Sequence, residues 1–111
     1  MNAFDKCGFG NHQDDNGNPA GGWVQGTGLR IDWQNGPLGR DADRKDPNGA
    51  FVETVISAVK QRIEWYQTAS NGKFKCVENT LAISHLEAAL NILNERTKSR
   101  EDRKVEGTHA K

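Results

Sequence analysis

The chain has 111 residues, of which 34% are apolar, and its 15 basic and 15 acidic side chains cancel to a formal net charge of zero. The length fits one domain, and a chain this short buries a small fraction of its surface, which favours oligomerisation as a source of further burial. The charge balance disfavours a protein that coats DNA or RNA, because such affinity comes from neutralising many phosphates. A local basic cluster for one small anion is still compatible with this composition.

Cysteine usage and hydropathy exclude two further classes. Cys7 and Cys76 are too few for a disulfide scaffold, no secretory signal precedes them, and no run is apolar enough to span a membrane. Neither Cys7 with His12 nor Cys76 with His85 has the spacing of a zinc site. We therefore expect a cytosolic protein with free thiols and no metal.

Glycine and proline divide the chain into two halves. Ten of the 12 glycines and all 3 prolines lie in residues 1–49, and only Gly72 occurs between Gly49 and Lys104. The composition predicts an α+β fold, in which an irregular or β-containing half precedes a helical hairpin. We expect a single domain made of an irregular segment at 1–22, a β-hairpin with its loop at 23–46, a helical hairpin at 47–104 and a tail at 105–111.

The strand signal is clearest after residue 22. Apolar and charged side chains alternate with a period of two, as in a half-buried strand, through Leu29, Arg30, Ile31, Asp32 and Trp33. The glycine-containing loop at 25–28 joins this strand to the apolar pair at 23–24 and suits a β-hairpin. Residues 1–22 have few apolar side chains and are expected to stay irregular unless they dock on another element.

Two helices are predicted next. Asp46 or Asn48 is expected to cap the first, whose apolar residues recur at helical spacing up to Tyr66. The segment Ser70–Gly72 predicts its end in a left-handed conformation, and a second helix begins near Cys76.

The second helix has a wide apolar surface. One face is formed by Val77, Leu81, Leu86, Leu90 and Leu93. Ile83 and Ile92 lie off that face, which predicts a second helical contact, as in a dimer or larger assembly.

The end of the second helix is basic. Arg96, Arg100 and Arg103 form one stripe, since they are spaced by four and three residues. In an antiparallel hairpin this stripe lies beside Arg44 and beside the start of the first helix, where free N–H groups near Asn48 and Gly49 favour an anion. Two interpretations stay open at this point: an anion site, or a solvated stripe neutralised by neighbouring acids. Residues 105–109 either fold back as a lid or form a disordered end.

Catalytic motifs are missing from the sequence. It has no Walker loop, no nucleophile with an adjacent base and no paired metal motif, which favours binding without turnover.

A family resemblance covers residues 23–109. The segments LRIDWQNGPLGRDADRKDPNGAFVETVI and CVENTLAISHLEAALNILNERTKSREDRKVEGTH resemble the phage Thoeris anti-defence sponges of the first type. The helical hairpin of those proteins is similar to that of the phage anti-CBASS sponges of the second type. The resemblance implies a non-enzymatic protein without a cofactor, which sequesters the cyclic nucleotide signal glycocyclic ADP-ribose (gcADPR) in the cytoplasm of the infected host. It also implies homo-oligomers, dimers or hexamers, whose pockets are built by more than one chain, and no membrane or nucleic-acid partner.

The resemblance also implies site residues. Ligand contacts are expected from Arg44, Phe74, Asn79, Arg96, Arg100, Asp102, Thr108 and His109. Because Phe74 and Asn79 lie near the hairpin turn and Arg44 and Arg96 at the other end, one site holds them all only if two hairpins pack antiparallel. Alternatives are a sponge mainly for cyclic di- or trinucleotides, with a separate site at Thr27 and Arg30, and a protein-binding adaptor hairpin.

Overall fold

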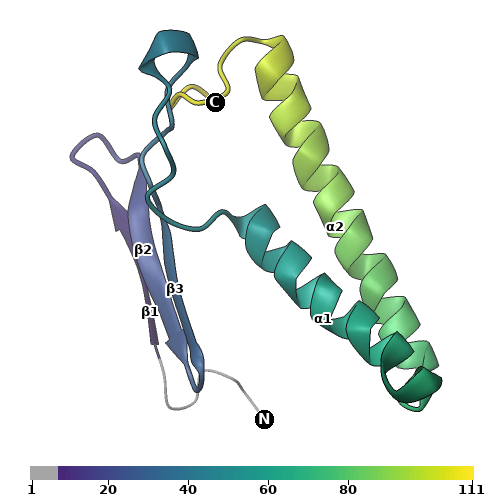
Figure 1. Cartoon of the computed structure of the whole chain (residues 1–111). Coiled ribbons are helices and arrows are strands. Elements are labelled where there is room, and N and C mark those ends of the chain that lie inside the picture. The colour runs from purple at the N-terminus through teal and green to yellow at the C-terminus, as the bar shows by residue number, and fades with distance from the viewer. Residues whose placement is uncertain (1–7) are drawn as a thin grey trace. The chain divides into compact units, whose positions relative to one another are not determined.

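The computed structural model describes residues 8–111, so Cys7 and its predicted thiol lie outside the described residues. The chain divides into two compact units (Figure 1). One contains the chain up to Phe51 together with Arg103–Lys111, and the other is Val52–Asp102. The α+β layout of a sheet followed by a helical hairpin is confirmed. The expectation of a single folding domain stays a prediction.

The first unit is built on a three-stranded antiparallel sheet in the order β1-β2-β3. Its strands are β1 (Gly8–Gln13), β2 (Pro19–Gly26) and β3 (Leu29–Asn35). The predicted hairpin of residues 23–33 is confirmed by the pairing of β2 with β3. The prediction that residues 1–22 are irregular is wrong for β1 and for the first half of β2.

The strand β1 forms because its glycines, which lack a side chain, leave room for a neighbouring indole ring. The Trp23 ring lies over β1, where a Cβ at Gly8 would come 3.4 Å from the ring and one at Gly10 only 2.7 Å from its Nε1. The Arg30 guanidinium stacks on the same indole, 5.4 Å from the ring centroid. Glycine weakens a strand locally, so β1 depends on pairing with β2 and on Trp23, which composition does not reveal.

The segment that follows the sheet departs from the predicted helix start. The backbone N–H groups of Asn48 and Gly49 both donate to Gln34 Oε1, at 2.9 and 3.2 Å. The Asn48 side chain bonds the backbone of Asn35 in both directions, at 2.8 and 3.0 Å. The helix starts later, at Val52. The prediction that Asn48 caps the helix and leaves N–H groups free for an anion is therefore wrong, because β3 binds these groups.

The second unit is the antiparallel hairpin of α1 (Val52–Gly72) and α2 (Val77–Asp102) (Figure 1). The chain leaves helical geometry at Ala69, and Ser70, Asn71 and Gly72 have φ values of 52°, 60° and 84°. The predicted left-handed turn is confirmed.

The seam between the helices is polar at several points. Half-buried side chains of α1 include Ile56, Lys60, Ile63 and Gln67, and those of α2 include Ile83, Leu86, Leu90 and Leu93. The prediction that Val77 and Leu81 share one face with Leu86, Leu90 and Leu93 is wrong. Val77 and Leu81 are 71% and 55% exposed, whereas Ile83, which was placed off that face, lies in the seam. No side chain of either helix is fully buried. Among residues 8–111, no helix is long and apolar enough to cross a membrane.

Candidate ligand pocket and arginine-bound tail

An open pocket of about 610 Å³ lies at the turn end of the helical hairpin. Its size falls within the range of small-molecule sites. The lining residues come from the last turns of α1, the break in the chain, and the start of α2: Arg62, Trp65, Tyr66, Ala69, Ser70, Phe74 and Asn79. The pocket therefore brings together two of the predicted site residues, Phe74 and Asn79.

Side-chain hydrogen bonds hold the start of α2 against α1. Gln67 accepts the backbone N–H of Cys76 at 3.0 Å and donates to Thr80 Oγ1 at 2.9 Å. The Cys76 thiol in turn accepts the backbone N–H of Asn79 at 3.4 Å and so caps the helix. These contacts fix the helical turn that carries Asn79. Among the described residues, none hydrogen-bonds the side-chain amide of Asn79, which leaves that amide available to a ligand.

Aromatic and cationic groups form the α1 side of the pocket. The Arg62 guanidinium lies 4.5 Å from the ring centroid of Trp65 and 4.9 Å from that of Tyr66. The two rings are themselves 5.5 Å apart. Our sequence interpretation missed this cluster, because Tyr66 continues the apolar periodicity of α1. The available signal is the spacing of Arg62, Trp65 and Tyr66 by three and four residues, which places them on one helix face.

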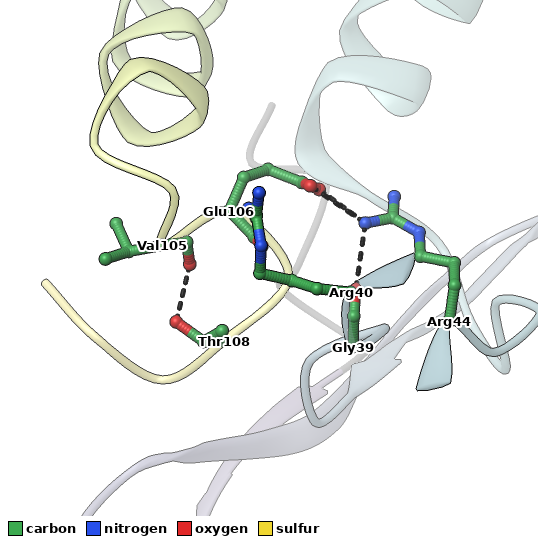
Figure 2. A network of polar contacts seen from close by, with 6 residues as sticks. All are labelled: Gly39, Arg40, Arg44, Val105, Glu106 and Thr108. Carbon is green, nitrogen blue, oxygen red and sulfur yellow. Dashed lines mark hydrogen bonds and ion pairs between the residues drawn. The ribbon is translucent and has the colours of Figure 1, made fainter. Parts of the chain in front are cut away.

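Figure 2 shows a second cluster, in the sheet-containing unit, where Arg44 binds the C-terminal tail. Arg44 Nη1 donates to both carboxylate oxygens of Glu106, each at 2.8 Å, and to the Gly39 carbonyl at 3.1 Å. Arg40 Nη1 donates to the Glu106 carbonyl, and the Gly39 N–H donates to the Gly107 carbonyl, both at 2.8 Å. The tail therefore folds back onto residues 39–44, and its action as a lid over a ligand stays a prediction.

The family described as "Acb2/Tad1, hairpin domain" matches residues 25–98, which contain the whole pocket. The chain belongs to this family. A relative from Bacillus phage SBSphiJ7, "Thoeris anti-defense 1", is 42% identical over 81 residues, which are 73% of this chain and 52% of the relative. The chain thus spans about half the length of that relative. The family resemblance seen in the sequence is confirmed.

Three further predicted residues of this Acb2/Tad1 hairpin lie at the far end of α2. Arg96 is exposed, Arg100 is half-buried, and Asp102 is exposed at the last position of the helix. Asn79 and Arg96 are 17 positions apart on one helix, which corresponds to about 26 Å along its axis. One hairpin therefore does not bring Asn79 and Arg96 into one small-molecule site. The predicted proximity of Arg96 and Arg100 to Arg44 stays a prediction.

Thr108 and His109 belong to the folded-back tail. The Thr108 hydroxyl donates to the Val105 carbonyl (Figure 2). It also accepts the Ala110 N–H, so it stabilises a turn. His109 is exposed. The pKa of the Asp14 carboxyl lies below its ordinary value, mainly because the Asn18 N–H donates to it, with a smaller contribution from the charge of His109.

The predicted second site lies on the sheet. Thr27 is exposed in the turn between β2 and β3. Arg30 donates to Asp32 at 2.9 Å and to Gln25 at 3.0 Å while it stacks on Trp23. The Asp32 hydrogen bond raises the pKa of Arg30. An anion bound by Arg30 must therefore compete with Asp32, and a second site in this family member stays a prediction. In the described part of the chain, no three His, Cys, Asp or Glu side chains gather as metal ligands.

Proposed function

We propose that this chain is a phage anti-defence protein that binds gcADPR, holds it intact and so keeps the Thoeris effector inactive. The observation that carries the proposal is the pocket of about 610 Å³ at the hairpin turn, since it lies within the part of the chain that defines the family. The name of the phage relative, "Thoeris anti-defense 1", supports the anti-Thoeris role. The site of action is the cytoplasm of the infected bacterium.

The pocket offers chemistry suited to a nucleotide. Phe74 is 55% exposed, so its ring has a face on which a base stacks, a contact worth about 1–3 kcal/mol per base. The Asn79 amide has both donors and acceptors for ribose hydroxyls or a base edge. Nanomolar sequestration requires about −12 kcal/mol, so further contacts must close around the ligand. We assign these to Arg44, Arg96, Arg100, Asp102, Thr108 and His109.

Assembly of two or more chains is part of the proposal. Phe74 and Asn79 lie at one end of α2 and Arg96 and Arg100 at the other, so a shared site needs a second hairpin in the opposite direction. The exposure of Val77, Leu81 and Ile92, at 71%, 55% and 65%, supports such packing, because a solvated apolar surface is costly. A dimer is the smallest assembly that meets this requirement, and a hexamer is a multiple of it.

Calorimetry with gcADPR tests the proposal directly. We expect near-stoichiometric binding, and release of chemically unchanged ligand when the protein is denatured. Phe74→Ala should raise the Kd by roughly five- to hundredfold, the range for loss of one stacking contact. Phe9→Ala is the matched control, since Phe9 is also exposed but lies on β1. Recovery of hydrolysed ligand would instead identify an enzyme.

A second candidate ligand is a cyclic di- or trinucleotide, as in the anti-CBASS sponges. The matched family, whose description joins Acb2 with Tad1, favours including it. Competition calorimetry separates the two cases: displacement of gcADPR indicates one pocket for both ligands, and simultaneous binding indicates a separate site at Thr27 and Arg30.

A further inference from the structure

Arg62 is held in the pocket by aromatic rings and not by a carboxylate. Its guanidinium faces two aromatic rings, with ring centroids at 4.5 and 4.9 Å. Within residues 8–111, no carboxylate pairs with it and no acceptor receives its hydrogen bonds. Stacking orients the planar guanidinium while leaving its five N–H donors in the plane of the fork unused.

Two carboxylates of the hairpin are bound by a different cation. Lys60 lies 3.3 Å from Glu64 on α1 and 3.5 Å from Glu87 on α2. The hydrogen bond that Lys60 donates to Glu64, aided by the charge of Glu87, raises the pKa of Lys60, so this lysine stays charged and keeps both partners. The positive charge of Arg62 is therefore left for a group that is not part of the hairpin.

The same pocket contains the other groups that a nucleotide needs. Phe74 presents a ring for a base, and Asn79 presents an amide for a hydroxyl or a base edge. A guanidinium fork matches the geometry of phosphate oxygens better than an ammonium group does. All three chemical parts of a nucleotide thus find a complement within about 610 Å³.

We propose that Arg62 is an anion-binding residue of this pocket, oriented by Trp65 and Tyr66 to bind a phosphate of a nucleotide whose base stacks on Phe74. The identification of that nucleotide as gcADPR rests on the proposed function. One hairpin turn then binds both base and phosphate, and Arg96 and Arg100 are left for the remaining phosphate charge.

Substitution at position 62 tests the assignment. Arg62→Met removes the charge and keeps a long, helix-compatible stem, and Arg62→Lys keeps the charge but loses the planar fork. In calorimetry with gcADPR we expect Arg62→Met to raise the Kd about ten- to hundredfold, the loss typical of hydrogen bonds to a charged group, and Arg62→Lys to fall between. The control is Lys98→Met. Lys98 is exposed on α2 outside the pocket, and it lies about 200° around the helix from both Arg96 and Arg100.

The outcomes separate this assignment from the proposed function. If the wild type binds gcADPR and Arg62→Met binds it equally well, the assignment of Arg62 is overturned and the sponge function stands. If the wild type does not bind gcADPR, the function fails, and the same variants are titrated with linear ADP-ribose. Binding that Arg62→Met abolishes then supports the assignment, and absence of binding overturns it. Helix content by circular dichroism should be the same in all variants, because residue 62 is exposed.

Discussion

At the scale of single residues, the Arg30–Asp32 pair on β3 couples the stability of the sheet to pH. The hydrogen bond from Arg30 lowers the pKa of the Asp32 carboxyl below its unfolded value of 3.8. A lowered folded pKa stabilises the fold above pH 3.8, and this contribution is lost as the pH falls through the folded pKa. We expect the melting temperature of the wild type to fall between pH 6 and pH 3, and Asp32→Asn to show a shallower fall and a lower value at pH 6.

Thermal unfolding followed by circular dichroism provides the measurement. Asp46→Asn is the matched control, because Asp46 is exposed and makes no side-chain hydrogen bond within residues 8–111. This control should follow the wild-type profile. Parallel profiles for Asp32→Asn and the wild type would show that the pair contributes nothing to the folded state.

At the scale of elements, the folded-back tail occupies Arg44, a residue that we expect the proposed ligand to use. Glu106 uses Arg44 Nη1 with both carboxylate oxygens at 2.8 Å, as a phosphate would. The side chains are 43% and 27% exposed, so solvent screens the pair and its strength is modest, up to about 1 kcal/mol. If Arg44 contacts phosphate, Glu106→Gln should tighten gcADPR binding about two- to fivefold, because the competing charge is removed.

The control for this prediction is Asp15→Asn, which removes an exposed negative charge from the loop between β1 and β2. It should leave the Kd unchanged. Weaker binding by Glu106→Gln would mean that Glu106 holds the tail in the conformation that binds the ligand, so that the ion pair belongs to the site.

The secondary-structure elements differ in how far the local sequence predicts them. Strand β3 and the turn at Ser70–Gly72 were predictable, because alternation and left-handed residues are local signals. The strand β1 was not, since its glycines form a strand only beneath Trp23. The start of α1 was misplaced because Gln34, 14 residues before Asn48, binds the N–H groups that a local rule assigns to the helix.

The pocket was only half predictable for a related reason. Phe74 and Asn79 came from a family resemblance, whereas Arg62 was overlooked because an arginine between apolar helix residues looks like a solvated side chain. Its role becomes visible only from its position over two rings and from the pairing of Glu64 and Glu87 with Lys60.

At the scale of the whole molecule, the helical hairpin lacks the burial that a stable core requires. No side chain of α1 or α2 is fully buried, and polar residues such as Lys60 and Gln67 lie in their seam. The exposed residues Val77, Leu81 and Ile92 are four and eleven positions apart, close to whole numbers of helical turns, so they share one side of α2. This side is the surface on which we expect a second hairpin to pack.

The last prediction joins assembly to ligand binding. By light scattering, the wild type should have at least twice the chain mass of 12.3 kDa, and Leu81→Glu with Ile92→Glu should shift it to the monomer. The double variant should also bind gcADPR far more weakly although it keeps every proposed ligand residue, because Arg96 of the same hairpin lies about 26 Å from Asn79 and no second hairpin supplies another Arg96. Asn94→Glu, on the opposite side of α2 from Ile92, should change neither property. Ile92→Ala, which retains the fold more easily, should make both assembly and binding depend on protein concentration. A monomer that binds gcADPR at full strength would show that one chain supplies all the contacts, and the antiparallel arrangement would then be wrong.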